Sequence, residues 1–266
     1  MTALHAAADP VPSTEPHLFP VALENIFTHD GIPIPRVKSV VRQDSRDPLS
    51  VVSDRYRLIT HGQAESRVKP FTDALGVAKI TRFLEKNGAR LISRYTYADQ
   101  TVTIPAVGDI VALEVNVINS YDSHLPLKYT LGARVLRCSN GMTVIGGEFE
   151  FSWKHTGEEQ EIILPDPVKV LAHFKKAGDT WDLWARTELK YEDRLKVMSS
   201  IVAMKVLTET QIKKWESNFE QAKTVWTLYD SFTYIITHEF AKLRESSRLH
   251  KLSQLQFAFS TLTQSL

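Results

Sequence analysis

The sequence predicts an α+β fold: a largely antiparallel sheet with an embedded helix, followed by a helical C-terminal region. Two observations carry this prediction. Apolar residues alternate with polar ones through much of residues 37–154, which is the two-residue period of a half-buried strand. From about residue 165 the apolar residues recur every three or four positions, which is the period of an amphipathic helix.

Six runs in the first part of the chain are typical of strands. Residues 37–43 and 50–60 are rich in β-branched side chains and flank the turn-like Asp47-Pro48. The later four runs alternate between apolar and polar residues, so each lines one face of a sheet with its apolar set. These are residues 88–97, 110–119, 127–138 and 142–154, of which we expect the last three to form an antiparallel meander.

Asn140-Gly141 predicts the turn between the last two of these strands. Both residue types tolerate a positive φ, which a type I′ hairpin turn requires. Gly146-Gly147 lies inside the run that follows and predicts a β-bulge or a close backbone contact.

One helix is expected between the strands, over residues 62–75. Pro70 is expected to kink that helix or to delay its start, and Gly76 to cap its end. After the sheet, residues 166–177 predict a short helix that Gly178 terminates.

Three further helices are expected in the C-terminal part. Residues 189–207 show helical spacing, and Thr208 with Gln211 forms a capping box for a helix over 209–223 or beyond. The apolar face of the 189–207 helix is expected to hold Tyr191, Leu195, Met198, Val202 and Val206. A last face, at steps of three and four residues, holds Val225, Tyr229, Phe232, Ile236, Phe240 and Leu243, and Phe232 at its centre is expected to be buried.

The chain therefore divides into three segments. Residues 1–35 contain several prolines and four acidic side chains but no Lys or Arg, and predict a flexible acidic tail. Residues 36–157 hold the sheet with one helix, and residues 158–266 form a helical region packed on that sheet. The last two segments are expected to make one continuous domain.

Composition narrows the class of protein. Apolar residues make up 43% and charged residues 24% of the chain, as in an ordinary globular domain rather than a disordered or coiled-coil one. Cys138 is the only cysteine, which suits a reducing compartment. The first 17 residues lack the pattern of a signal peptide, and no run of about 18 apolar residues occurs. We expect a cytoplasmic protein without a membrane partner.

The formal net charge of +1 hides a strong asymmetry. Residues 36–97 hold 13 basic and 6 acidic side chains, a net charge of +7, whereas residues 98–170 hold 5 basic and 10 acidic ones, a net charge of −5. The basic block can attract phosphate groups. Alternatively, it forms a surface that pairs with the acidic block.

A search for catalytic and cofactor motifs is mostly negative. Neither phosphate-binding loop pattern, GxxxxGK[ST] or GxGxxG, occurs, and GxSxG does not occur either. His238-Glu239 begins a zinc-protease pattern, but Lys242 stands where the second histidine is needed. We expect no cofactor and no metal site, and the sequence favours a protein that is not an enzyme without settling the point.

Two minor alternatives stay open. Cys138 can act as a nucleophile with His124 or His155 as its base, although a free cysteine at the end of an apolar strand usually packs as a small hydrophobic residue. Acidic residues in the middle of the chain can supply oxygen ligands for Mg²⁺, although the same pattern suits a solvated strand face. These residues are Asp109, Glu114, Asp122, Glu148 and Glu150.

The candidate binding residues are cations of the basic block. Arg90 and Arg94 share one face of a strand, and Lys79 and Arg82 lie just before them. Arg134 adds a cation from another strand. Grooves that bind nucleic acid combine cations along the backbone with aromatic platforms for the bases, and Tyr95 and Tyr97 are expected on the other face. These five cations are our predicted nucleic-acid contacts.

Three segments together resemble a known family. They are VVSDRYRLITHGQAESRVKPFTDAL (51–75), VINSYDSHLPLKYTLGARVLRCSNGM (117–142) and VWTLYDSFTYIITHEF (225–240). Each is similar to a segment of the phage- and plasmid-borne proteins grouped as domain of unknown function 932, and the three occur in the family's order. The motif positions that this chain retains include Asp54, Arg55, Tyr56, Asn119, Asp122, Lys128, Arg134, Cys138, Asn140, Thr233 and His238.

The chain departs from the family pattern at four positions. Ser123 stands where the family pattern has Gly, and Asp230, Ser231 and Tyr234 replace Asn, Ala and Glu. If those polar positions form a site in relatives, the site is altered here. The resemblance implies a setting in a mobile genetic element and does not by itself give an activity.

Three functions remain as expectations. The first is a nucleic-acid-binding protein of a phage or plasmid, with single-stranded DNA as its partner, for strand binding or annealing in recombination. Annealing needs a cationic groove rather than a catalytic residue, often repeated around a homo-oligomer. The second is a non-catalytic module that interacts with a host protein. The third is a metal-dependent nuclease with an unrecognised motif.

Overall fold

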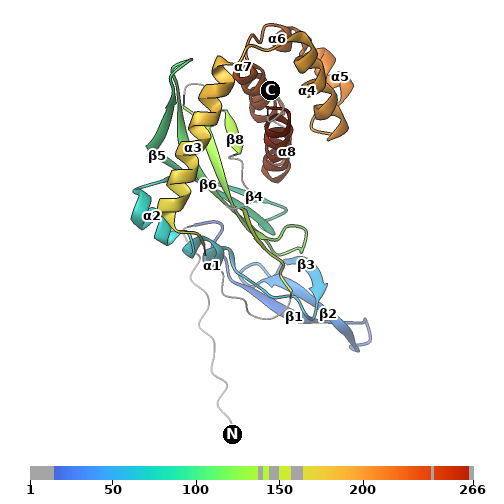
Figure 1. The fold of residues 1–266 in the computed structure, drawn as a ribbon. Helices are drawn as coiled ribbons and strands as arrows, with labels where there is room; N and C mark the ends of the chain where they lie inside the picture. Colours follow the sequence, from blue (N-terminus) through green and yellow to red (C-terminus); the bar gives the residue numbers. More distant parts are fainter. Residues whose placement is uncertain (1–14, 137–139, 144–149, 157–163, 241–242, 264–266) are drawn as a thin grey trace.

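The computed structural model describes residues 15–136, 140–143, 150–156, 164–240 and 243–263, and Figure 1 shows how they are arranged. The fold is mixed α+β with antiparallel sheets and a helical C-terminal region, as the sequence predicts. The strands form two separate sheets rather than one. The smaller sheet lies at the opposite end of the molecule from helices α4 to α7 (Figure 1).

The small sheet contains β1 (Val21–Phe27), β2 (Pro33–Arg42) and β3 (Pro48–Ser53), in that order. The prediction of a flexible tail over residues 1–35 is therefore wrong from residue 21 onwards. The polar and proline-rich composition of the segment hid a strand that pairs with β2 through backbone hydrogen bonds. A small second core holds this sheet against the rest of the chain, and its buried residues are Phe19, Val40, Val52, Tyr56 and Tyr121.

Two helices replace the single helix expected over residues 62–75. They are α1 (His61–Ser66) and α2 (Lys69–Leu75), and Thr60 with Gln63 forms a capping box at the start of α1. Pro70 lies in the first turn of α2, where a missing backbone N–H costs nothing because no carbonyl is available for it. The proline therefore delays the start of a second helix, one of the two outcomes that the sequence predicted.

The main sheet has six strands. They are β4 (Lys79–Glu85), β5 (Arg90–Ile104), β6 (Asp109–Ser120), β7 (Leu127–Val135), β8 (Gly141–Thr143) and β9 (Glu150–Trp153). β4 to β7 pair in sequence order, and both β8 and β9 pair with β7, all antiparallel. The predicted meander is confirmed, except that the run 142–154 gives two short strands.

The predicted turn at Asn140-Gly141 is wrong. Gly141 already belongs to β8, opposite Arg134, and its φ is not positive. The carbonyl of Asn140 accepts a hydrogen bond from the backbone N–H of Val135, so Asn140 already pairs with β7. The position of Asn140 is set by its side-chain contacts with Asp230 and His238 rather than by a local preference for a turn, and sequence periodicity does not show such contacts. Gly146-Gly147 lies outside the described residues.

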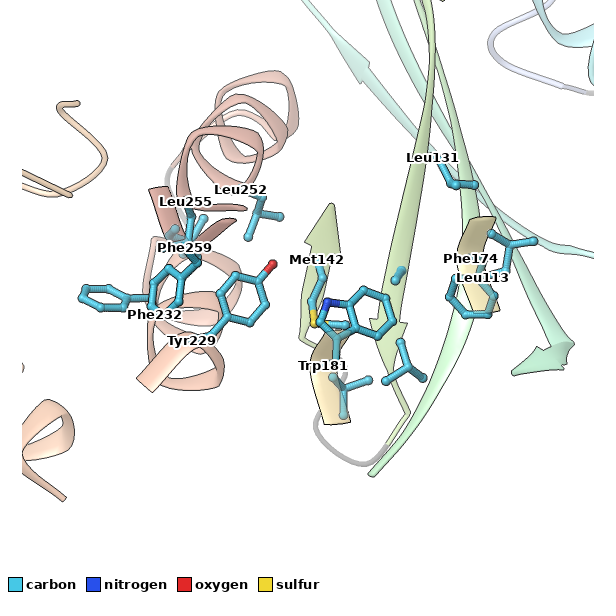
Figure 2. Packing of buried hydrophobic residues seen from close by; sticks show 14 of the residues in the cluster. Leu113, Leu131, Met142, Phe174, Trp181, Tyr229, Phe232, Leu252, Leu255 and Phe259 are labelled. Carbon is cyan, nitrogen blue, oxygen red and sulfur yellow. The ribbon is translucent and has the colours of Figure 1, made fainter. Parts of the chain in front are cut away.

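The two faces of the main sheet differ in character. One face is apolar and packs under α1, α2 and α3 (Pro167–Arg186); Figure 2 shows Phe174 and Trp181 of α3 beside Leu113 and Leu131 of this face. The other face, which we call the polar face, lies towards α8 (Glu245–Thr263). Its central residues are Arg94, Glu114, Asn116, Lys128, Thr130, Arg134, Glu150 and Ser152.

Helix α3 does not end at Gly178 as predicted but continues to Arg186. Gly178 is buried, and a Cβ at this position would lie only 3.0 Å from Val102 Cγ2 of β5. The glycine is therefore needed for the close approach of the helix to the sheet rather than for a helix end.

The C-terminal helices are shorter than the sequence suggests. They are α4 (Tyr191–Ala203), α5 (Glu209–Lys214), α6 (Glu216–Glu220), α7 (Val225–Tyr234) and the π-helix Ile235–Glu239. The capping box of Thr208 with Gln211 is confirmed. The predicted apolar face of residues 189–207 is only partly right: Val206 is buried and Met198 packs against the core, but Tyr191 and Leu195 are exposed. The buried residues of α4 are Val197 and Ile201.

The predicted apolar face of α7 is confirmed along most of its length. Val225, Tyr229, Phe232 and Ile236 are buried. Figure 2 shows Tyr229 and Phe232 against Leu255 and Phe259 of α8, a helix that the sequence analysis did not foresee. In the described part of the chain, none of the helices has the length and apolar character needed to cross a membrane.

Candidate functional site

The polar face carries two rows of side chains across strands β6, β7 and β9. Ile118 lies opposite Lys128, and Lys128 opposite Ser152. The next row contains Asn116, Thr130 and Glu150. Directly opposed residues project from the same face of an antiparallel sheet, so these six side chains form a continuous floor.

Helix α8 faces this floor with a stripe of residues at helical spacing. Ser246, Leu249, His250 and Ser253 lie at positions i, i+3, i+4 and i+7, which is one side of the helix. They line a cleft of about 240 Å³ between the helix and the sheet. The sheet side of the cleft is lined by Ile118, Leu125, Pro126, Lys128, Thr130, Glu150 and Ser152. We call this space the α8 cleft.

The first turn of α8 is fixed to the sheet by polar contacts. The backbone N–H and the hydroxyl of Ser246 donate to the Glu85 carboxylate, at 3.1 and 2.9 Å. Glu245 is buried and accepts a hydrogen bond from Arg94. These contacts hold the helix over the polar face, so the α8 cleft is part of the fold rather than a gap between loosely packed elements.

A buried ion cluster lies next to the cleft on the same face. Glu114, only 2% exposed, accepts a hydrogen bond from Arg134 Nε at 2.6 Å and one from the Thr96 hydroxyl at 2.8 Å. Arg94 Nε lies 3.4 Å from the other oxygen of Glu114. The structure thus brings together Arg94 and Arg134, two of the predicted binding residues, around one carboxylate.

Lys128 is the cation that lies in the cleft itself. Its Nζ is 2.7 Å from Glu150 Oε1, and the two side chains are 26% and 45% exposed. A pair this accessible to water contributes little to stability, so the ammonium group can exchange its partner at low cost. Lys128 is a position that the family resemblance retains, although our predicted nucleic-acid contacts did not include it.

The other three predicted cations lie apart from this cluster. Arg90 is buried on the polar face, and its Nε donates to Asp122 Oδ2 at 2.7 Å. Lys79 is exposed on the same face of the edge strand β4. Arg82 projects from the opposite face and pairs with Glu65 at 2.8 Å. Tyr95 and Tyr97 also lie on the opposite face, as predicted.

These contacts agree with the alternative interpretation of the basic block (residues 36–97), in which it pairs with the acidic block (residues 98–170). Arg90 pairs with Asp122, and Arg94 pairs with Glu114, so two of its arginines neutralise carboxylates of the acidic block. A substitution of Arg90 would remove the guanidinium partner of the half-buried Asp122, and a substitution of Arg94 would remove one of the two arginines that face the buried Glu114. Either change would lower stability. Such variants cannot report on binding alone, which makes Lys128 the better position for a binding test.

The first two family segments meet at the junction of the two sheets. The Tyr56 hydroxyl donates to the Ser120 carbonyl at 2.7 Å, and Asn119 Nδ2 donates to the Ile59 carbonyl at 2.9 Å and contacts His61 Nδ1 at 3.0 Å. Asp122 binds Arg90, as described above. Asp54 and Arg55 are exposed in the turn after β3. Tyr56 and Asn119 therefore join the segment that follows β3 to the end of β6, whereas Asp122 joins the end of β6 to β5.

His61 is the centre of this junction and is completely buried. Burial disfavours the charged ring and lowers the pKa of His61 to about 4, partly offset by its hydrogen bond to the Gly88 carbonyl. Nε2 donates to that carbonyl, so Nδ1 is left to accept from Asn119. A proton on Nδ1 would replace this hydrogen bond with a contact between two donors.

We expect this histidine to make stability depend on pH. The imidazole of His61 binds its proton near pH 6.5 in the unfolded chain and only near pH 4 in the folded chain. The contribution of His61 to the free energy of unfolding should therefore be constant above about pH 7 and fall by about 3 kcal/mol as the pH drops towards 4. Urea unfolding at several pH values measures this. His61→Gln should be less stable at pH 7 but lose less between pH 7 and 5; equal losses in both proteins would contradict the assignment.

The third family segment meets the β7–β8 connection. Asn140 Nδ2 donates to Asp230 Oδ1 at 2.7 Å, and Asn140 Oδ1 lies 3.0 Å from His238 Nε2. The buried Thr233 hydroxyl donates to the Asp230 carbonyl at 2.8 Å. Asn140 thus attaches α7 and the π-helix to the residues at the start of β8, whereas the Thr233 hydrogen bond lies within α7. Cys138, the remaining motif residue, lies outside the described residues.

The half of the cleft that α8 supplies was not predicted from the sequence. The signal was present, because Ser246, Leu249, His250 and Ser253 follow helical spacing, but that stripe is mostly polar and gives no apolar periodicity. Across the described ranges, no group of three or more His, Cys, Asp or Glu side chains is placed to hold a metal ion.

The chain was also compared with known proteins. The curated proteins and the solved structures give no match. One family model matches residues 48–256, which is more than half of the chain and contains all three of the segments that resemble the family. The chain therefore belongs to the family described as "Domain of unknown function (DUF932)".

Proposed function

We propose that this chain binds single-stranded nucleic acid on the polar face of its main sheet, at the α8 cleft. The observation that carries the proposal is the α8 cleft, because it joins a lysine, hydroxyl groups and an imidazole in one accessible groove. Lysine ammonium groups and Ser or Thr hydroxyls are the groups that proteins use to contact phosphate and sugar.

The ion cluster beside the cleft supports the same proposal. Arg94, Arg134 and Arg248 face the two buried carboxylates Glu114 and Glu245. Charges that are little exposed to water are screened less than surface charges. These three guanidinium groups and two carboxylates carry a formal charge of only +1. We infer that the cluster holds α8 over the sheet, and that Lys128 is the residue that contacts phosphate directly.

The family resemblance gives the proposal a setting. It implies a phage or plasmid protein, and such elements commonly encode recombination proteins. Strand annealing requires a groove that holds one strand while its bases stay available, and does not require a catalytic residue. We propose annealing as the activity in that setting, with a homo-oligomer repeating the cleft along the strand.

Salt dependence of binding tests the role of Lys128. A phosphate contact releases a counterion, so Lys128→Ala should reduce the slope of log K against log salt for single-stranded DNA by about 0.7. Lys176→Ala is the matched control, because Lys176 is exposed on α3, which covers the opposite face of the sheet. Fluorescence anisotropy at several salt concentrations measures both slopes. Equal slopes in the two variants would place the binding surface elsewhere.

A second candidate function rests on a different surface. The β1–β2 hairpin points away from the rest of the molecule (Figure 1) and exposes Phe27, Ile32 and Ile34, which are 54%, 61% and 39% exposed. Neighbouring exposed apolar side chains are typical of sites that contact other proteins. This surface favours a protein-interaction module, whose affinity would change little with salt.

A further inference from the structure

The α8 cleft has room for one small group rather than for a strand. Its volume is about 240 Å³, below the roughly 300–1,000 Å³ of pockets that enclose drug-sized ligands. A double helix cannot enter a space of this size. A single strand can place one of its units in the cleft while its neighbours remain outside.

The lining of the cleft is divided by chemistry. Ile118 of β6, Leu125 and Pro126 before β7, and Leu249 of α8 supply apolar surface. The side chains from β7 and β9 are polar, and the Lys128–Glu150 ion pair lies among them. A nucleotide has the same division, because its base offers flat apolar faces and its sugar-phosphate offers hydroxyl and anionic oxygens.

The Lys128–Glu150 pair indicates where the phosphate would lie. Glu150 is 45% exposed, so its carboxylate can move into water and leave the ammonium group to a phosphate oxygen. The hydroxyl of Ser152, directly opposite Lys128, is on the same face and can donate to a second oxygen. Across the cleft, Ser253 and His250 of α8 face this position.

We infer that the α8 cleft is a subsite for a single nucleotide, with its base against Ile118 and Leu249 and its phosphate on Lys128. This inference rests on the proposed function, since it makes the cleft the point at which a bound strand inserts one unit. Because the subsite holds a single nucleotide, we also expect a free nucleoside monophosphate to bind there in the absence of any nucleic-acid strand.

Three small molecules separate the parts of the subsite. Thymidine 5′-monophosphate should bind, and both thymidine and inorganic phosphate should bind about tenfold more weakly or worse, because each lacks half of the contacts. Ligand-observed NMR titration of the full chain measures all three. If thymidine 5′-monophosphate binds no better than inorganic phosphate, the apolar part of the cleft does not hold a base and the inference fails.

A variant that fills the cleft tests its location. Ser253→Leu places a larger side chain in the space, and should weaken thymidine 5′-monophosphate binding by about tenfold or more. Ser199→Leu is the control, because Ser199 is an exposed serine within helix α4. Thermal unfolding confirms that each variant is folded. If Ser253→Leu does not fold, Lys128→Met, which keeps an unbranched stem of similar length, gives the same test through the loss of the phosphate contact.

The outcomes distinguish this inference from the proposed function. Wild-type protein that binds single-stranded DNA but not the mononucleotide, or a folded Ser253→Leu variant with unchanged mononucleotide affinity, overturns the subsite and leaves the proposed function intact. Wild-type protein that binds the mononucleotide but no single strand overturns the proposed function and leaves the subsite. Mononucleotide binding that weakens in Ser253→Leu and not in Ser199→Leu supports the inference.

Discussion

Glu114→Gln is expected to lower the free energy of unfolding by about 3–5 kcal/mol, the usual cost of removing one partner from a buried ion pair. Glu114 is 2% exposed and faces the guanidinium groups of both Arg94 and Arg134. Glutamine keeps the volume of the side chain and removes the charge. The two guanidinium groups then lose the charge of Glu114 at a place that water reaches poorly, since Arg94 and Arg134 are only 12% and 17% exposed.

Arg186→Ala provides the control for this variant. Arg186 and Asp182 form an ion pair at 2.7 Å on the outer side of α3, with the arginine 60% exposed. Exposed pairs contribute little, so this variant should unfold at the same urea concentration as wild type. A Glu114→Gln variant as stable as Arg186→Ala would show that the cluster around Glu114 is open to water rather than buried.

Phe232→Ala is expected to cost about 3–5 kcal/mol, the usual range for a buried aromatic side chain. Phe232 is 0% exposed, stacks on Phe219 with ring centroids 4.4 Å apart and meets Phe259 edge to face at 6.0 Å. Its removal leaves a cavity between α6, α7 and α8. Urea unfolding measures the loss.

Phe257→Ala is the matched control, because Phe257 lies on α8 two residues from Phe259 and is 64% exposed. It should unfold within about 0.5 kcal/mol of wild type. Similar small losses in both variants would mean that the apolar face of α7 is not a core surface, and would reopen it as a site for a partner.

The sequence predicts the parts of this fold that depend on side-chain period. The alternation of residues 110–119 identifies β6. It also identifies the face of β6 that packs in the core, which holds Val111, Leu113, Val115 and Val117. It fails for β1 and β4, whose burial is partial, so their pattern of apolar residues is weak. The prediction of a helix end at Gly178 also fails, because the close contact of α3 with Val102 requires a glycine within the helix.

For the candidate site, the sequence predicts that certain arginines lie on one surface, but it does not predict that these arginines form ion pairs. Arg94 and Arg134 were expected to share a surface, and they do meet on the polar face. Their partners, Glu114 and Glu245, come from distant parts of the chain, and no local pattern shows that such charges will be neutralised. The cleft itself depends on α8 crossing the sheet, which only the tertiary structure shows.

The central claim, that the chain binds a single strand of nucleic acid, is tested most directly by an electrophoretic mobility shift of the wild-type protein. Labelled single-stranded DNA, double-stranded DNA and RNA are compared at about 50 mM and about 200 mM salt, a range over which several phosphate contacts change affinity by orders of magnitude. We predict a shift of single-stranded DNA at the lower salt, a much weaker shift at the higher salt and little shift of the duplex at either. No shift of any single strand at the lower salt, or a shift that salt does not weaken, would contradict the claim and favour the protein-interaction surface on the β1–β2 hairpin.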